Sequence, residues 1–348
     1  INFIMLIINK CIYLLGRLKS LIFILFYGKK YQEELKKKIL HLSVETINIC
    51  NANCTFCAYG LQERPEGIMT ESLFKKIILD YVKMGGGDLG LTPTVGEPFA
   101  DKNIVSRVKF ARSFPEIKKI GTYTNLISLG IFNIDDVVTC GFTELIISTS
   151  GFDEEMYLRI YRSKQYQRMY NNLIKLLKAN KKHGSPIDIS IDMRSDLSLA
   201  QTRNLKDYKN ILNYISESKC IYKFRYDDWA GKIKQKDLSG KMKIRKNNSP
   251  FHLRVSPCFE YFNGPHIYRD GTVGICGCRD VDAKNLIIGD VNKNTIKEIW
   301  QNQKHKEYMN RFNTNPPDIC AVCSHYNNVS VLANDRYKKL LKNQKIIY

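Results

Sequence analysis

Apolar and polar positions alternate along the middle of the chain in a way that predicts an α/β fold. Short runs rich in Ile, Val, Thr and Tyr, typical of strands, are separated by longer segments with helical spacing of apolar residues. Strands are predicted at residues 43–49, 88–95, 117–125, 143–150, 187–193 and 220–226. Helices are predicted at residues 70–84, with Thr70 as N-cap, and at 102–114, 133–139, 154–182 and 200–217. This alternation favours a parallel sheet, wound as a partial, TIM-like (β/α)6 barrel over residues 43–226.

The first 42 residues have a different pattern. Their apolar runs are interrupted by polar residues, and none reaches the roughly 18 residues expected of a membrane-spanning helix. Asn9, Lys10, Arg17 and Ser20 form one polar stripe on a helical wheel. Residues 1–42 are therefore predicted to form an amphipathic segment, packed either on a membrane surface or on the protein itself.

The barrel pattern also stops after residue 226. Residues 227–256 are basic and contain Gly, Ser, Asn and Pro, which predicts a linker or loop. Residues 257–326 hold five of the eleven cysteines, which indicates a second, smaller metal-binding domain. Residues 327–348 are predicted to form a C-terminal helix.

Composition and charge narrow the class of protein. With 44% hydrophobic and 25% charged residues, the 348-residue chain has the composition of a globular protein. The net charge of +20 favours an anionic partner: nucleic acid, a membrane surface or a phosphorylated substrate. The cysteines are too sparse for a disulfide scaffold and indicate metal sites in a reducing compartment. A cytoplasmic location is expected, either free or peripheral at the inner face of the membrane.

Three cysteines directly follow the first predicted strand. Cys50, Cys54 and Cys57 have the spacing C-x3-C-x2-C. Ordinary ferredoxin clusters use four cysteines, so three thiolates leave one iron of a 4Fe–4S cluster open to a small molecule. A zinc site completed by His41 is the alternative.

The cysteine motif resembles the signature of the radical S-adenosylmethionine (SAM) enzymes, which have an aromatic residue, here Phe56, before the third cysteine. The segment TVGEPFAD (94–101) is similar to the Gly-Gly-Glu-Pro segment of the family, with Val95 in place of the first glycine. The segment YTNL (123–126) matches the Thr-Asn segment of the third strand. The resemblance implies SAM contacts from Phe56, Gly96, Glu97, Pro98, Thr124, Asn125, Ser148, Ser150 and Arg194.

The tail is similar to the iron–sulfur extension called SPASM, or to its shortened form, twitch. The similarity covers DGTVGIC, IIGDVNKNTIKEIW and the cysteine spacing. It implies one auxiliary 4Fe–4S cluster held by Cys258, Cys276, Cys320 and Cys323, and so two 4Fe–4S clusters in all. A structural zinc on the same thiolates is the alternative. Cys278 is surplus to this ligand set.

The resemblance implies reductive cleavage of SAM to a 5′-deoxyadenosyl radical, which takes a hydrogen atom from the substrate. Either oxidation, with an electron passed to the auxiliary cluster, or epimerisation, with Cys278 as hydrogen donor, then follows. The basic, apolar N-terminal region favours a sugar or glycan-type substrate, phosphorylated or lipid-linked. Arg225, Asp227, Asp228 and Trp229 are its candidate contacts, with a capped turn as the alternative interpretation of this segment.

Other classes remain open from the sequence. Relatives with such a tail often modify ribosomally made peptides, some radical SAM enzymes modify RNA, and an iron–sulfur electron-transfer protein would never meet SAM. A reducing partner such as flavodoxin or ferredoxin is expected, and DNA is not an expected partner.

Overall fold

The computed structural model describes residues 39, 41–245, 258, 260–277, 279–311 and 316–326. The predictions for most of the N-terminal segment, for Cys278 and for the C-terminal helix lie outside the described residues. Among the helices of these described ranges, none combines the length and apolar character needed to cross a membrane.

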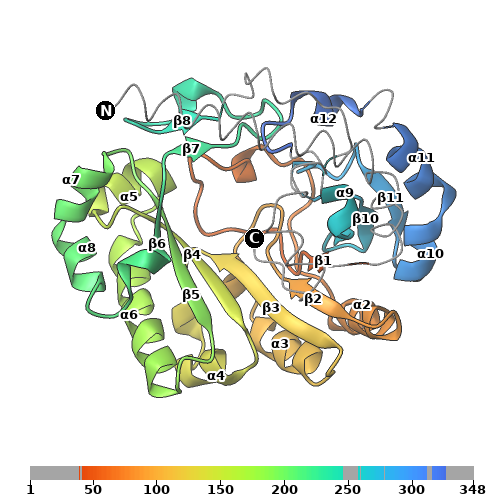
Figure 1. The fold of residues 1–348 in the computed structure, drawn as a ribbon, viewed down its shortest axis with the longest axis horizontal. Coiled ribbons are helices and arrows are strands. Elements are labelled where there is room, and N and C mark those ends of the chain that lie inside the picture. The colour runs from red at the N-terminus through yellow and green to blue at the C-terminus, as the bar shows by residue number, and fades with distance from the viewer. Residues whose placement is uncertain are drawn as a thin grey trace, which may run out of the picture.

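A nine-stranded sheet forms the centre of the protein, in the order β11-β10-β9-β1-β2-β3-β4-β5-β6 (Figure 1). Strands β1 to β6 pair in parallel with their sequence neighbours, which confirms the predicted parallel barrel sheet. Their bounds are β1 (His41–Val44), β2 (Gly87–Gly90), β3 (Ile117–Thr124), β4 (Glu144–Ser150), β5 (Asp188–Arg194) and β6 (Cys220–Lys223).

Helices connect these strands and lie along the outside of the barrel (Figure 1). The predicted cap of the first one is confirmed: Thr70 Oγ1 accepts a hydrogen bond from the backbone N–H of Leu73. The helices are α2 (Glu71–Lys83), α3 (Ile104–Arg112), α4 (Ile134–Thr139), α5 (Glu154–Tyr161), α6 (Tyr166–Lys182), α7 (Leu199–Asn204) and α8 (Lys206–Ile211). Short 3-10 helices are η1 (Tyr59–Leu61), η2 (Pro98–Ala100), η3 (Leu129–Ile131), η4 (Glu217–Lys219) and η5 (Gln235–Asp237).

Some predicted element boundaries were wrong. The predicted helix 154–182 is divided into α5 and α6 at Arg162, whose φ of 51° is left-handed and ends a helix. The first strand begins at His41, so the barrel starts two residues before the predicted boundary. It ends at Val44, and the backbone N–H of Glu45 donates to the carbonyl oxygen of Ile267 in the C-terminal domain.

The C-terminal domain extends the barrel sheet. Strand β9 (His266–Ile267) pairs in parallel with β1, and β10 (Thr272–Gly274) and β11 (Ile287–Asp290) continue antiparallel. This continuation was not predicted, since strands of two or three residues carry little periodicity. The helices of this domain are α9 (Glu260–Asn263), α10 (Ile296–Gln301), α11 (Gln303–Arg311) and α12 (Asp318–Val322).

The predicted linker, residues 227–256, contains a short strand, β8. Strand β7 (Arg225–Tyr226) pairs in parallel with β8 (Lys243–Ile244), and this two-stranded ribbon lies above the barrel strands in Figure 1. Residues 246–257 lie outside the described residues. The linker prediction is therefore wrong for the segment that forms β8.

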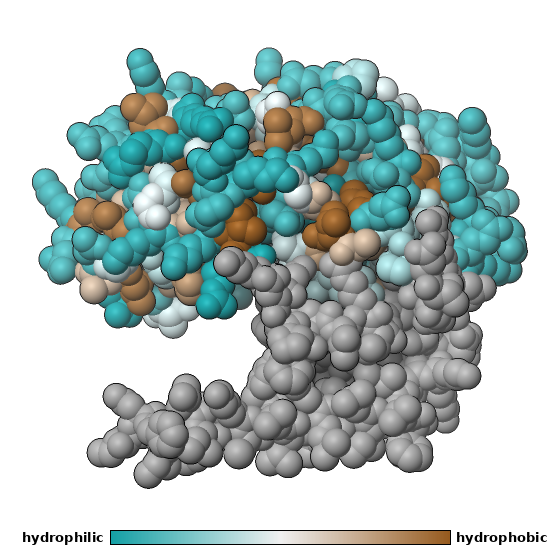
Figure 2. Space-filling view, turned by 90° about the horizontal axis from the view of Figure 1, so that it is seen from above, coloured by the Kyte–Doolittle hydropathy of each residue, from teal (hydrophilic) through white to brown (hydrophobic). Residues whose placement is uncertain are grey.

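One hydrophobic core includes residues of both domains. Leu42 and Val44 of β1 belong to the same buried cluster as Ile267 and Val273 of the C-terminal strands. Full burial of each such side chain contributes roughly 1.5–3 kcal/mol. The described surface in Figure 2 is mostly hydrophilic, with separate hydrophobic patches. The two domains are therefore joined through buried apolar packing as well as through strand pairing.

Candidate active site

A cavity of about 510 Å³ lies inside the barrel and reaches the C-terminal domain. Side chains of β1, β4 and β5 line it at every second position, as in Glu144, Ile146 and Ser148 of β4. All three cysteines of the C-x3-C-x2-C motif line this cavity. The predicted cluster loop therefore faces this cavity.

The cysteine loop is held on the end of α5. The backbone N–H groups of Asn53 and Thr55 donate to the carbonyl oxygens of Tyr161 and Ile160, at 3.3 and 2.9 Å. Burial, together with the charges of Glu97 and Cys57, raises the pKa of Cys50 to about 12. Three thiols that face one cavity match the donor set of an iron–sulfur cluster, whose irons stabilise the thiolate form.

Glu97 lies opposite the cysteine loop and is fully buried. Its carboxylate accepts hydrogen bonds from Thr124 Oγ1 at 2.6 Å, from the Asn125 backbone N–H at 2.7 Å and from the Phe99 N–H at 3.1 Å. Burial raises its pKa to about 7, against the effect of these donors. A carboxylate in this position fits an ammonium group, which would stabilise the charged form.

Gly96 allows the chain to pass close to the cysteine segment. Its φ is +144°, and a Cβ atom there would lie 2.8 Å from the carbonyl oxygen of Ile47. The next residue, Glu97, donates its N–H to the carbonyl oxygen of Ile49 at 2.9 Å. The predicted SAM segment and the cysteine loop are thus joined directly through the backbone.

Asn125 connects the end of β3 to the same loop. Its Nδ2 donates to Asn51 Oδ1 at 2.8 Å and lies 3.8 Å from the sulfur of Cys50. The predicted Thr-Asn segment therefore contacts both the carboxylate of Glu97 and the cysteine loop.

Arg194 and Phe56 meet on another side of the cavity. The guanidinium of Arg194 lies 4.8 Å from the centroid of the Phe56 ring, which also contacts Tyr161 and Tyr226 at 5.5 Å each. Ser148 also lines the cavity, and its hydroxyl lies 2.8 Å from that of Tyr161. These predicted SAM residues are brought together with the cysteines.

Two predicted SAM residues lie away from the cavity lining. Ser150 is the last residue of β4 and is fully buried, and its hydroxyl has no hydrogen-bond partner among the described residues. Pro98 is buried as the first residue of η2. Neither side chain lines the cavity, so their predicted contact with SAM has no support from their positions.

The auxiliary cysteines gather around Tyr261 of α9. The Tyr261 hydroxyl lies 3.4 Å from the sulfur of Cys320, and burial together with the charges of Cys320, Cys276 and Cys258 raises its pKa. Cys323 is linked to Cys320 by a backbone hydrogen bond of 3.4 Å. Within the described ranges, no three Cys, His, Asp or Glu side chains surround a single metal-ion position.

Cys276 also lines the cavity. The auxiliary set is therefore adjacent to the space that the first three cysteines face.

The predicted substrate residues have protein partners of their own. The Trp229 indole N–H donates to the carbonyl oxygen of Phe56 at 2.9 Å, and Arg279 lies 4.7 Å from the Trp229 ring centroid. Asp227 forms an ion pair with Arg279, and Asp228 accepts a hydrogen bond from Ser324 at 2.7 Å.

Asp228 does not line the cavity, whereas Arg225, Asp227 and Trp229 do. The alternative interpretation of this segment, a turn with a packed tryptophan, describes Trp229 better than stacking on a sugar does. The same segment joins the cysteine loop to the C-terminal domain.

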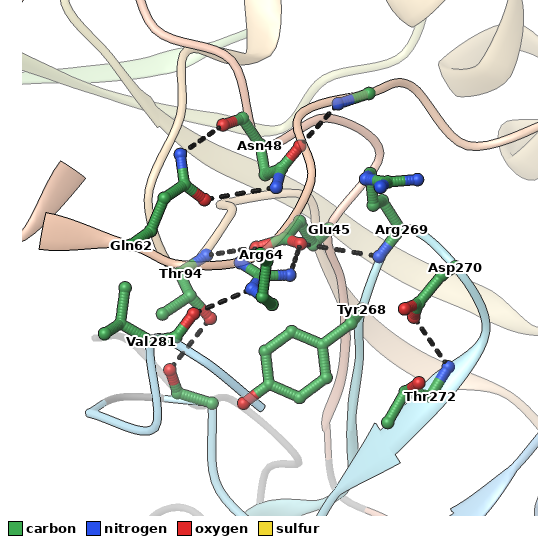
Figure 3. A network of polar contacts seen from close by, with 12 residues as sticks. Glu45, Asn48, Gln62, Arg64, Thr94, Tyr268, Arg269, Asp270, Thr272 and Val281 are labelled. Carbon is green, nitrogen blue, oxygen red and sulfur yellow. Dashed lines mark hydrogen bonds and ion pairs between the residues drawn. The ribbon is translucent and has the colours of Figure 1, made fainter. Parts of the chain in front are cut away.

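A buried polar network also joins the barrel to the C-terminal domain (Figure 3). Arg64 forms two hydrogen bonds to the Glu45 carboxylate, at 2.5 and 3.0 Å, and donates from Nε to the carbonyl oxygen of Val281 at 2.7 Å. Thr94 donates its N–H to Glu45 at 3.1 Å. Burial raises the pKa of Glu45, and the paired Arg64 opposes that rise.

Two residues of the cavity lining, His266 and Arg279, were not among the predicted site residues, and His41 was expected only as the ligand of an alternative zinc site. All three line the cavity. Burial lowers the pKa of both histidines to about 3, so both are neutral. His41 is at an inward position of β1, and strand alternation alone identifies it. His266 and Arg279 lie in the C-terminal domain, and only the folded chain brings them to the barrel.

Comparison with known proteins identifies the class. The chain matches the Radical SAM superfamily over residues 44–192 and the SPASM iron–sulfur cluster-binding domain over residues 258–324. Residues 44–192 are thereby identified as a radical SAM domain and residues 258–324 as a SPASM extension. Its cofactors are 4Fe–4S clusters and SAM.

Particular relatives cover parts of the chain. It is 22% identical over 150 residues to GTP 3′,8-cyclase of Vibrio cholerae serotype O1, which is 42% of this chain and 44% of that protein. The structure of Streptococcus suis SuiB bound to precursor peptide SuiA has a TM-score of 0.57 at 11% identity, over 88% of this chain and 77% of that chain. BtrN in complex with AdoMet and 2-DOIA has a TM-score of 0.51 at 17% identity, over 84% and 94%. At these identities the solved structures show a shared fold.

Proposed function

We propose that this radical SAM enzyme oxidises or epimerises a sugar or glycan-type substrate. The observation that carries the proposal is one cavity that is lined by the three cysteines of the barrel loop, by Glu97 and by Cys276 of the auxiliary set. Such a cavity lets a small substrate contact both cofactor sites. When bound, the cluster and SAM supply a one-electron cleavage that yields a 5′-deoxyadenosyl radical, which abstracts hydrogen.

The proposal assigns a role to each residue of the cluster and SAM sites. Cys50, Cys54 and Cys57 hold the cluster with its open iron. Glu97 binds the ammonium group of SAM, and Arg194 binds its carboxylate. Residues of this kind orient SAM and exclude water without taking part in bond cleavage themselves.

The auxiliary site decides between oxidation and epimerisation. For oxidation, Cys258, Cys276, Cys320 and Cys323 would hold a second cluster that could accept one electron after the substrate has lost a proton. For epimerisation, the thiol of Cys278 would return a hydrogen atom to the opposite face. The thiyl radical left on Cys278 would then take one electron from the reducing partner and one proton from solvent. Turnover in heavy water separates the two: epimerisation incorporates one solvent deuteron at the attacked carbon, and oxidation does not.

A ribosomally made peptide is the second candidate substrate. The likeness to SuiB, whose structure contains a precursor peptide, supports it at the level of fold. The BtrN structure contains the small molecule 2-DOIA, and its likeness covers 94% of that chain, which supports the sugar-type candidate to a similar degree. The cavity of about 510 Å³ favours a small substrate.

The proposal is tested with Cys54→Ala. Loss of one of three ligands should abolish the SAM-cleaving cluster, so reduction with dithionite should yield no 5′-deoxyadenosine. Cys220→Ala is the matched control, because Cys220 is half-buried in β6 and outside the cavity. Formation of 5′-deoxyadenosine by Cys54→Ala at the rate of the control would refute the radical assignment.

A further inference from the structure

The β7–β8 ribbon carries positive charge on one face. Neighbouring residues of a strand point to opposite sides, so Lys243 and Arg245 share one face and Ile244 lies on the other. Parallel pairing aligns Arg225 with Lys243, which adds a third cation to that face. On the opposite face, the Tyr226 side chain is buried against the barrel. The ribbon therefore has one cationic and one apolar face.

Two cations of this ribbon line the active-site cavity, Arg225 and Arg245. Within the described part of the chain, neither forms an ion pair with a carboxylate. The neighbouring cavity arginine, Arg279, is paired with Asp227. Carboxylates such as Asp227 and Glu260 line the same cavity, but among the described residues none lies within 4 Å of either guanidinium group.

Arg225 is also held in a defined position. Its guanidinium lies 5.2 Å from the centroid of the Phe224 ring, which is itself stacked on Tyr222 at 6.0 Å. The next residue, Tyr226, packs against Phe56 of the cysteine loop. Arg225 is therefore next in sequence to a residue that contacts Phe56, and both Arg225 and Phe56 line the cavity.

Both guanidinium groups therefore lack an ion-pair partner among the described residues. Two like charges on one cavity wall attract anions from solution. An anionic ligand could supply the partner that the described carboxylates do not.

We propose that Arg225 and Arg245 bind the phosphate or pyrophosphate group of a small phosphorylated substrate at the cavity mouth. Two guanidinium forks match phosphate oxygens in geometry and charge. The rest of the substrate reaches from this rim toward the SAM site, past Phe56. This assignment rests on the proposed function, which supplies the reaction. It adds the chemical group, a phosphate or pyrophosphate, that anchors the substrate.

The test measures binding of inorganic pyrophosphate to the unreduced holoenzyme by isothermal titration calorimetry. The double variant Arg225→Gln/Arg245→Gln should bind about tenfold or more weakly, because charge-assisted hydrogen bonds are lost. Arg225→Lys/Arg245→Lys keeps the charge but loses the fork and should bind with intermediate affinity. The control, Lys164→Gln/Arg168→Gln, removes the same charge from exposed positions at the start of α6.

Equal affinity of the double variant and its control overturns the proposal. Binding of an RNA oligonucleotide or of anionic vesicles, without binding of pyrophosphate, overturns it as well. Iron content and circular dichroism verify that each variant is folded, and the single variant Arg225→Gln repeats the test if the double variant is not. The binding test uses no reductant and does not depend on cleavage of SAM. If the reduced wild type forms no 5′-deoxyadenosine, that result contradicts the proposed reaction and leaves the anion site untouched.

Discussion

Glu97 combines complete burial with strong hydrogen bonding. Three donors contact its carboxylate, among them Thr124 Oγ1 and the Asn125 N–H, yet burial raises its pKa to about 7 from an ordinary value of 4.5. Hydrogen bonds alone do not offset the desolvation of its charge. The proposed ammonium of SAM supplies the missing positive charge, so SAM binding and ionisation of Glu97 are coupled.

This coupling predicts a pH-dependent affinity for SAM. The ionised fraction of a group with a pKa of about 7 grows from about one-tenth to about one-half between pH 6 and pH 7. Affinity for SAM should therefore rise about fivefold over this interval, measured by calorimetry on the unreduced holoenzyme. Glu97→Gln should bind SAM more weakly and show no such rise. An equal rise in that variant would contradict the role of Glu97.

The same pKa sets the sign of a stability change. The pKa of Glu97 is higher in the folded state than in the unfolded chain, so protonation of Glu97 stabilises the fold. This contribution to the free energy of unfolding is complete below about pH 4.5 and is lost as the pH rises through about 7. In the absence of SAM, Glu97→Gln removes this part of the pH dependence of unfolding.

At the scale of elements, Thr94 joins the loop between β2 and η2 to the auxiliary site. Its hydroxyl donates to the carbonyl oxygen of Gly277 at 2.9 Å and accepts from His266 Nε2 at 3.0 Å, a tautomer assigned from this network. Gly277 packs directly on His266, since a Cβ there would lie 2.1 Å from the ring. The loop that presents Glu97 is therefore coupled to the residue that follows Cys276.

Replacing Thr94 with valine should loosen this junction. The change removes both side-chain hydrogen bonds at nearly constant volume and should cost about 1–3 kcal/mol in the free energy of unfolding. We also expect an altered electron paramagnetic resonance signal of the reduced auxiliary cluster. Thr94→Ser, which keeps the hydroxyl, should restore both properties.

Thr139→Val serves as the control, because Thr139 has an exposed hydroxyl on α4. A change there should stay within about 0.5 kcal/mol. If Thr94→Val and Thr139→Val have the same stability and the same spectrum as the wild type, Thr94 does not position the auxiliary loop.

At the scale of the whole molecule, the barrel and the C-terminal domain form one continuous structure. They share the nine-stranded sheet through the pairing of β9 with β1, and they share one hydrophobic core. The buried pair of Arg64 and Glu45 adds polar contacts across the same boundary (Figure 3). Two cofactor sites on one rigid sheet keep a constant separation, which suits transfer of an electron between substrate and cluster.

The two cysteine groups should nevertheless load iron separately. Replacing Cys320 and Cys323 together with alanine should lower the iron content from about eight to about four atoms per chain, the content of one 4Fe–4S cluster. Elemental analysis measures both iron and zinc. Cys220→Ala should retain all of its iron. Full iron in the double variant, or zinc in the native tail, would contradict an auxiliary cluster held by these residues.

Local sequence determined the catalytic framework of this protein. The spacing of Cys50, Cys54 and Cys57, the segment around Glu97 and the alternation of strands and helices are properties of neighbouring residues. The periods of strands and helices can be recognised in short stretches of sequence. Parallel strands bring their carboxyl ends to one edge of the sheet, where the cysteine loop follows the first strand. The parallel barrel and its cysteine loop could therefore be predicted before the fold was known.

Only the tertiary structure decided what surrounds that framework. Pairing of β9 with β1 brings His266 and Cys276 to the cavity from more than 200 residues away in the sequence. Ser150 and Ser148 point to the same side of β4, but Ser150 lies at the buried end of the strand. The indole N–H of Trp229 donates to a carbonyl oxygen of the protein itself. Partners of this kind depend on long-range packing, in which contacts between distant segments outweigh local preference, and no local pattern of residues encodes them.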